Sequence, residues 1–340
     1  MIDMKDSSPD SNNLTRRSFI STTARAAAGA AAVASAVGSP RAGAAAPASK
    51  DSEGSETAMV PCATLGKAKI SRVLLGGNLV SGFMHCRDLK YVGPLFRAYV
   101  TEAKLMETFQ LAEQHGINTV FETGAEYVKR YNKDFDGHMQ FIPHIQVKLN
   151  QDDAALGDHI KKQVDTGAVA LYVWGVAADT LVQAGAVDRI AKAVEMAKKH
   201  GLPVGVGGHS LQVPMLCEKN KVPCDFYVKT FHTDKYPSAT PKPQRKEFIW
   251  LNGGEGWYDN MWCINPEETI AFMKTITKPW IAFKVLAAGA IYPREAFPYA
   301  FKNGADFIAV GMFDFQIKEN CDLARKVIRL VQNRERPSLA

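Results

Sequence analysis

The chain has 340 residues, of which 46% are hydrophobic and 22% are charged, and its net charge is +6. This length allows one large α/β domain or two small ones. The positive excess is spread along the chain, and no apolar run of roughly 18 residues or more lies outside the N-terminal region. The composition therefore disfavours nucleic-acid binding and a multi-pass membrane protein, and favours a small-molecule substrate as the partner.

The first segment, residues 1–46, resembles a twin-arginine signal peptide. Arg16 and Arg17 in "TRRSFI" precede a weakly apolar, alanine-rich stretch, and small residues follow with an expected cleavage site near residues 44–46. Such a signal implies that the twin-arginine export machinery carries the folded protein to the periplasm or beyond, with any cofactor loaded before export. No membrane span is expected after the signal is removed.

Residues 47–60 predict a flexible linker and residues 61–340 a single catalytic domain. One sequence pattern recurs in that domain: an amphipathic helix is followed by a glycine and then by an apolar run. Examples are "LAEQHGINTVFE" and "AFKNGADFIAVG". The glycine ends the helix in a left-handed conformation, and the run is typical of a strand buried on both faces. This alternation predicts parallel strands joined by right-handed crossovers.

The pattern predicts eight strands and seven helices, which fit a (β/α)8 TIM barrel. The alternative, a doubly wound open sheet, would favour a G-x-G-x-x-G turn after the first strand, and "GGNLVSG" does not match it. The predicted strands are 72–78, 119–123, 142–149, 170–175, 203–209, 226–231, 280–286 and 307–313. The predicted helices are 101–115, 153–166, 180–200, 210–219, 266–276, 293–303 and 316–333.

Two strand-to-helix connections, residues 78–100 and 232–265, are long and leave the barrel at the end where active sites of this fold lie. Loops of this length are typical of lids. The second connection carries Trp250, Trp257 and Trp262, which we interpret as walls for a sugar ring. The alternative is that these rings only attach the loops to the rim.

Polar residues close several predicted strands, including three lysines. Burying an ammonium group without a partner is costly, so we expect Glu122 to lie near Lys148 on the neighbouring strand, with Lys284 in the same cluster. We predict that these three are catalytic, and that Asn78 and Lys229 bind substrate.

"HGINTVFETGAEY" resembles the aldo-keto reductase motif, in which a strand ends in an acid and a catalytic tyrosine follows. The resemblance places Glu122 on the acid, Tyr127 on the tyrosine and Lys148 on the lysine that ends the third strand. "ADFIAVGMFDFQIKEN" is similar to the family's last strand and helix, and implies that Glu319 and Asn320 contact a nucleotide. The resemblance implies an oxidoreductase that uses NADP(H) on a carbonyl or hydroxyl of a sugar-like molecule, with Tyr127 as general acid.

The sequence departs from that family at Gly175, where the family has a histidine. A non-redox alternative is a sugar isomerase or lyase in which Glu122, His209 and His232 hold a divalent metal and a strand-end lysine acts as acid or base. The last alternative is a carbohydrate-binding barrel without catalysis.

Glycines near the last two strands indicate a further possibility, phosphate or flavin binding. Gly289 in "VLAAGA" and Gly311 in "VGMFDF" lie where many barrels hold phosphate. We therefore include both glycines among the candidate cofactor-binding residues.

Overall fold

The computed structural model describes residues 59–84, 86, 89–247 and 261–340. All of them belong to one compact unit, Ser55–Ala340. The predicted signal peptide (1–46), most of the predicted linker, and the predicted substrate residues Trp250 and Trp257 lie outside the described residues.

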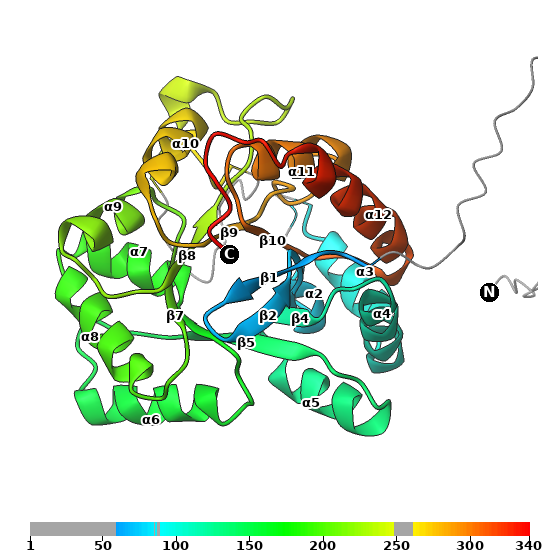
Figure 1. Cartoon of the computed structure of the whole chain (residues 1–340), viewed down its shortest axis with the longest axis horizontal. Helices are drawn as coiled ribbons and strands as arrows, with labels where there is room; N and C mark the ends of the chain where they lie inside the picture. Colours follow the sequence, from blue (N-terminus) through cyan, green and yellow to red (C-terminus); the bar gives the residue numbers. More distant parts are fainter. Residues whose placement is uncertain (1–58, 85, 87–88, 248–260) are drawn as a thin grey trace, which may run out of the picture. The chain divides into compact units, whose positions relative to one another are not determined.

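Eight parallel strands form a closed barrel in the described part of the chain (Figure 1). They are β3 (Val73–Gly76), β4 (Thr119–Glu122), β5 (Gln140–Ile145), β6 (Leu171–Val173), β7 (Val204–Gly208), β8 (Phe226–Thr230), β9 (Trp280–Phe283) and β10 (Phe307–Val310). Each strand pairs with its successor in the chain, and β10 closes the ring on β3. The predicted TIM barrel is therefore confirmed, and each predicted strand overlaps an observed one.

The helices surround the barrel. They are α2 (Gly77–Val80), α3 (Val92–Tyr99), α4 (Glu102–Gln114), α5 (Ala125–Asp134), α6 (Asp153–Val164), α7 (Gly175–Gln183), α8 (Val187–Lys198), α9 (Gln212–Lys219), the 3₁₀ turn η1 (Lys242–Gln244), α10 (Pro266–Thr275), α11 (Pro293–Lys302) and α12 (Asp314–Leu330). The predicted single helix over 180–200 is wrong. It divides into α7 and α8, because Gly185 adopts a φ of 72° directly after the first of them.

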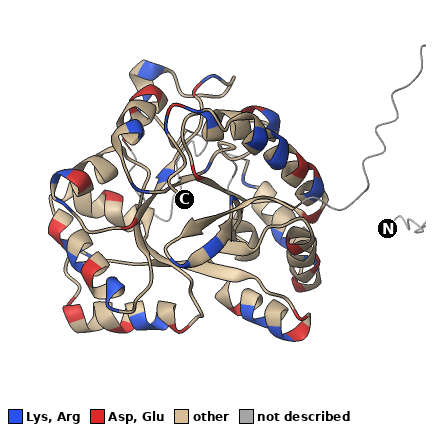
Figure 2. Ribbon diagram, in the orientation of Figure 1, with Lys and Arg blue, Asp and Glu red and all other residues tan. Residues whose placement is uncertain are grey.

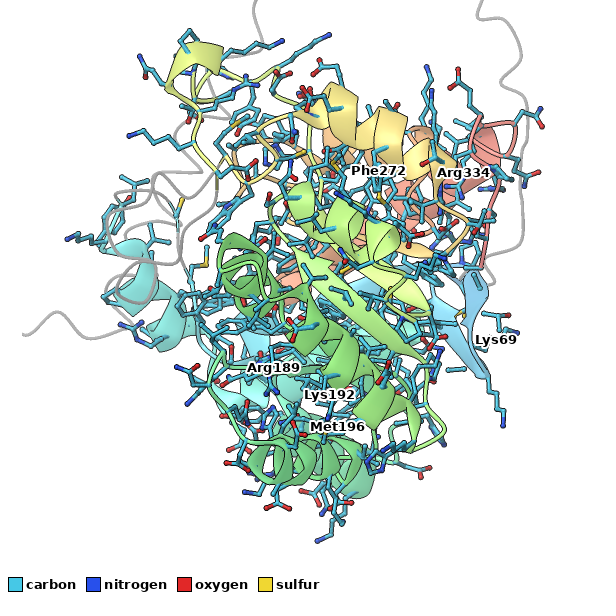
Figure 3. The ribbon with its side chains drawn as sticks, turned by 90° about the vertical axis from the view of Figure 1, so that its left-hand side faces the viewer. Lys69, Arg189, Lys192, Met196, Phe272 and Arg334 are labelled. Carbon is cyan, nitrogen blue, oxygen red and sulfur yellow. The ribbon has the colours of Figure 1, made fainter. Side chains whose placement is uncertain are left out.

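Charged residues belong mainly to the outer helices (Figure 2), as expected when the barrel strands are buried on both faces. Between α6 and α8, Arg189 and Lys192 both reach Asp153, with nitrogen–oxygen distances of 3.3 and 2.7 Å (Figure 3). Such partly exposed pairs stabilise a fold little. Helix attachment therefore depends mostly on the apolar side chains between helices and strands.

The N-terminal end of the barrel is closed by an antiparallel hairpin that the sequence analysis does not predict, β1 (Cys62–Leu65) and β2 (Ala68–Ser71). Leu65 and Ile70 of the hairpin, together with Ala340, pack against the side chains inside the barrel. The hairpin and the C-terminal tail cross the centre of the ring in Figure 1. The N-terminal end of the barrel is therefore covered by the chain itself.

Within the described residues, no helix combines the length and the apolar character that a membrane crossing needs. The six cysteines are all free. Cys217 and Cys224 are buried, and burial raises the pKa values of both thiols.

Candidate active site

Glu122 ends β4 in a left-handed backbone conformation, with a φ of 85°. Non-glycine residues adopt this conformation at a cost, and such residues cluster at functional sites. The unusual φ takes Glu122 out of the regular alternation of the strand. Its Oε1 accepts a hydrogen bond of 3.0 Å from Nε1 of Trp174, which follows β6. The carboxylate therefore lies at the C-terminal end of the barrel, hereafter the mouth.

Lys284 directly follows β9 and also has a positive φ, of 54°. Its Nζ lies 4.0 Å from the ring centroid of Trp262 and 5.1 Å from that of Phe283. An ammonium group over an aromatic face gains a cation–π attraction, which is stronger when the pair is shielded from water. Two charged residues with left-handed backbone thus lie at strand ends on different sides of the mouth.

Two indole rings connect these sides of the mouth. Trp262 and Val176 form a small buried cluster, and Trp174 packs against it. His144 stacks on Trp174 with 5.1 Å between ring centroids, and burial lowers the pKa of His144 to about 4. The uncharged rings of His144, Trp174 and Trp262 therefore lie between Glu122 and Lys284.

His209 and Asp179 form a buried pair beside Trp262. Nδ1 of His209 lies 2.7 Å from Oδ2 of Asp179, and the same carboxylate accepts backbone N–H bonds from His209 and Ser210 at 3.0–3.1 Å. Since a carboxylate only accepts, Nδ1 carries the proton, and Nε2 is the basic nitrogen of the ring. The His209 ring centroid lies 5.1 Å from that of Trp262.

Burial is the main cause of a lowered pKa at His209. The positive charges of Lys284 and Lys229 act in the same direction, while the hydrogen bond and charge of Asp179 oppose them. The ring is thus oriented by a carboxylate and favoured in its neutral form. This is the arrangement that general base catalysis needs. Gly175 lies beside the ring, since a Cβ at this position would be in ordinary contact with Cε1 of His209, at 3.4 Å.

The predicted metal site is not assembled. Among the described residues, no three histidine, cysteine, aspartate or glutamate side chains could hold a metal ion together. Nε2 of His232 accepts backbone N–H bonds of 3.0 Å from Trp262 and Cys263, and its Nδ1 donates to the carbonyl of Thr233. Both nitrogens of His232 are thus used by the backbone, so this histidine anchors Trp262 and does not fit a metal.

Lys229 does not face the mouth, contrary to its predicted role in substrate binding. Its side chain is 1% exposed, and its Nζ donates to the carbonyl and hydroxyl of Thr230. Phe226 and Val228 belong to the cluster inside the barrel, so strand alternation places Lys229 on the outer side of β8. Burial lowers its pKa.

The predicted partnership of Glu122 with Lys148 is also wrong. Lys148 lies three residues beyond β5 and is exposed, and no ion pair in the described part of the chain joins it to Glu122. Tyr127 lies in α5, where its ring packs against the outer core. No hydrogen bond between described residues links Tyr127 to Lys148. Among the described residues, no side-chain hydrogen bond or ion pair therefore joins any two of Glu122, Tyr127 and Lys148, and the catalytic role of Tyr127 stays a prediction.

Asn78 lies in α2, directly after β3, and is partly exposed at the mouth end. Its role in substrate binding stays a prediction.

The candidate cofactor residues differ in their exposure. Gly289 and Gly311 are exposed, and a Cβ at either position would have open space around it. On α12, Glu319 is exposed while Asn320 is 5% exposed. The start of this helix presents Asp314, whose carboxylate accepts from Tyr99 and Lys104. Lys104 thus neutralises the carboxylate at this helix end, and the role of the four residues in binding a nucleotide stays a prediction.

Sequence reasoning missed Asp179 and Trp174. Asp179 is 30 residues from His209 in the chain, and Trp174 is 52 residues from Glu122. The only local signal is that Trp174, like Glu122, His209 and Lys284, falls at the end of an apolar run. No pattern in the sequence marks Asp179, because it lies within a helix among alanines.

No family model matches the sequence, and the search of curated proteins gives no match. Among solved structures, the chain is similar to the BexX/CysO complex of Amycolatopsis orientalis, with 11% identity over 80% of this chain and 96% of that chain and a TM-score of 0.46. It is also similar to the N-acetylneuraminic acid synthetase of Leptospira borgpetersenii, with 12% identity, coverage of 81% and 91%, and a TM-score of 0.42. The native KDPGal structure gives 8% identity, coverage of 76% and 94%, and a TM-score of 0.41. Because these values are low, the fold assignment rests on the strand order itself.

Proposed function

We propose that the chain is an enzyme that moves a proton at a hydroxyl, or at the carbon next to a carbonyl, of a small sugar-like molecule. The observation that carries this proposal is the His209–Asp179 pair beside Lys284 at the mouth. In this proposal Nε2 of His209 takes the proton and later returns it, as expected for an oriented neutral imidazole.

Lys284 and Glu122 take complementary roles in the proposal. The Lys284 ammonium stabilises the oxyanion that forms as the proton leaves, since a positive charge aimed at developing negative charge lowers the barrier. The Glu122 carboxylate, oriented by the indole of Trp174, accepts a hydrogen bond from a substrate hydroxyl. The aromatic face of Trp262 supports a sugar-like ring.

Deuterium exchange tests the proposal without knowledge of the substrate. A panel of aldoses, ketoses and hydroxy-carbonyl compounds would be incubated with the protein in deuterated water and followed by NMR. We expect deuterium at the carbon next to the carbonyl of at least one compound, and no incorporation with His209→Gln. His138→Gln is the matched control, because the His138 side chain is 81% exposed. Equal exchange in all three proteins would refute the role of His209.

The second candidate is oxidoreduction of the same carbonyl or hydroxyl. It is supported by the resemblance of "HGINTVFETGAEY" to the aldo-keto reductase motif, in which Glu122 matches the family's acid. A nicotinamide would supply the hydride. This candidate is tested by three measurements. Near-ultraviolet absorbance of the purified protein detects a retained nicotinamide, and consumption of NADPH with a carbonyl panel detects turnover. Elemental analysis detects a metal. Retained nicotinamide would favour it over proton transfer alone.

Export through the twin-arginine route is part of the proposal, and it is supported by the sequence of residues 1–46 alone. Replacing Arg16 and Arg17 by lysine should retain the protein in the cytoplasm. Cell fractionation measures this, and unchanged export of the double variant would contradict the signal assignment.

A further inference from the structure

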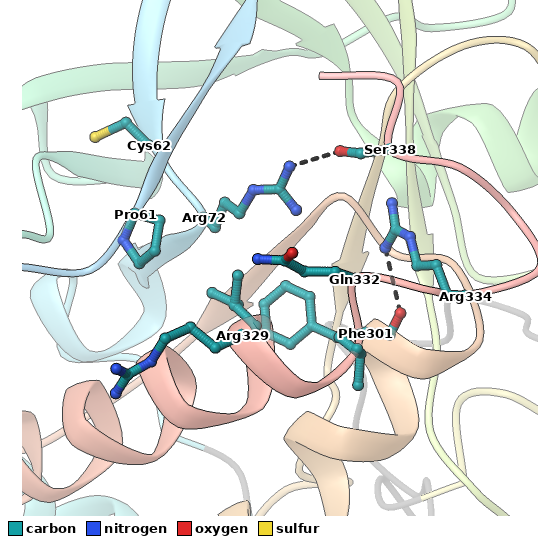
Figure 4. A pocket seen from close by; sticks show the side chains of 10 residues that line it. Pro61, Cys62, Arg72, Phe301, Arg329, Gln332, Arg334 and Ser338 are labelled. Atoms are coloured by element: carbon teal, nitrogen blue, oxygen red, sulfur yellow. Dashed lines mark hydrogen bonds between the residues drawn. The ribbon is translucent and has the colours of Figure 1, made fainter.

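A cavity of about 380 Å³ lies at the N-terminal end of the barrel, away from the proposed site (Figure 4). It is bounded by the start of the hairpin at Cys62, by Phe301 at the end of α11, and by the C-terminal tail. Arg72 and Arg334 lie on opposite sides of it, with Gln332 between them. The proposed function makes no use of this region.

The cavity wall carries more positive than negative charge. Asp306 is fully buried and forms ion pairs of 2.6 Å with Arg334 and 2.8 Å with Arg336. Arg72 is also attracted by Asp306, but no ion pair within the described residues gives it a carboxylate of its own. The cavity is lined by three arginines, Arg72, Arg329 and Arg334, and by no carboxylate side chain among the described residues.

Hydrogen bonding leaves the Arg72 guanidinium available to a ligand. Its Nη2 donates to the hydroxyl of Ser338 at 2.5 Å, and its remaining donors have no hydrogen-bond partner among the described residues. Burial lowers the pKa of Arg72 and that of Arg334, and the positive charge of Arg72 lowers the latter further. Partly buried positive charge without a matching anion is costly, and a bound anion would remove that cost.

We propose that this cavity binds a small molecule through an oxyanion group, a phosphate or a carboxylate, that accepts hydrogen bonds from the Arg72 guanidinium. Arg334 faces the same space but contributes only its charge, because its Nη1 and Nη2 already donate to the carbonyls of Phe301, Ala305 and Pro337 and to Asp306. Planar guanidinium groups bind such oxyanions with two parallel hydrogen bonds. Ser338 and Arg334 both belong to the tail that closes this end of the barrel. The ligand would therefore hold the tail against the hairpin and stabilise the fold.

The test uses the full chain and measures unfolding temperature and binding heat with inorganic phosphate and, separately, with acetate. Sodium chloride at matched ionic strength is the reference. We expect a saturable rise in unfolding temperature with at least one of the two anions, and the arm that responds identifies the oxyanion. Arg72→Gln should weaken binding at least about tenfold, which corresponds to about 1.4 kcal/mol.

Two further variants keep the result interpretable. Gln332→Glu adds a carboxylate to the cavity wall while leaving every arginine in place, and it should also abolish binding. Arg294→Gln, at the far end of α11 with a 76% exposed side chain, removes the same charge elsewhere and should bind like the wild type. A response that does not saturate, that chloride reproduces, or that survives both Arg72→Gln and Gln332→Glu would overturn the proposal.

Discussion

The exchange of Asp179 for asparagine is the sharpest test of the proposed proton transfer. The Asp179 carboxylate accepts from Nδ1 of His209 at 2.7 Å and from the backbone N–H groups of His209 and Ser210. An asparagine has only one oxygen that can accept from these three donors. Its NH2 group is itself a donor and would face at least one of the three N–H groups. The His209 ring would then be free to adopt the other tautomer, with its proton on Nε2.

The structure sets the size of this effect. Losing a buried hydrogen bond to a charged group costs about 1.5–3 kcal/mol of folding free energy. The loss of an oriented general base should lower the exchange rate by roughly 10²–10⁴-fold. Because Asp179 raises the pKa of His209, its removal should also shift the acidic limb of the rate profile toward lower pH.

The assay is the rate of deuterium incorporation as a function of pH, with thermal unfolding as a check on the fold. Asp188→Asn, an exposed aspartate on α8, makes the same chemical change outside the site and should behave like the wild type. A folded Asp179→Asn protein with the wild-type rate and pH profile would refute the assigned role of the pair.

Three further outcomes follow from the same contacts. Folding lowers the pKa values of His144 and His232 from 6.5 to about 4. Between these pH values the unfolded chain binds protons at both histidines and the folded chain does not. The free energy of unfolding should therefore fall as the pH decreases from 6.5 to about 4. Each histidine contributes about 3 kcal/mol at most, and thermal unfolding of His232→Gln should show a shallower pH dependence; an unchanged slope would contradict the assignment. Lys284→Met should lower the exchange rate at least about tenfold and alter the fluorescence of Trp262, whereas a normal rate would remove the ammonium from the mechanism. Lys148→Ala should leave the rate within about twofold, since this lysine is exposed, and a large loss would instead favour the tyrosine–lysine arrangement of the resemblance.

Part of the site could be predicted because its positions follow from the strand ends. Glu122, His209 and Lys284 end apolar runs, and in a parallel barrel all strand ends meet at one face. Their partners could not be predicted in this way. Asp179 reaches His209 only because α7 begins directly after β6 and packs against β7, and such packing leaves no local pattern in the sequence.

The predictions for Lys148 and Lys229 failed because the sequence does not show where a strand ends or which side of it faces the barrel. The predicted third strand continues to residue 149, whereas β5 ends at Ile145, which leaves Lys148 in an exposed loop. Strand alternation places Lys229 on the outer side of β8, and the apolar run alone does not show which side faces the barrel. When both faces of a strand are buried, apolar and polar residues do not alternate along it. The sequence then does not indicate to which side a given side chain points.

The sequence by itself determined the repeated helix–glycine–strand unit, and therefore the barrel and the end of it at which charged residues gather. Local backbone preferences and the burial of apolar runs are sufficient for that result. Only the tertiary structure decided which of those residues meet, because their contacts join segments far apart in the chain. Examples are the left-handed backbone at Glu122 and Lys284 and the hydrogen bond to His232 that anchors Trp262. The ion pairs of Asp306 with Arg334 and Arg336 are another example.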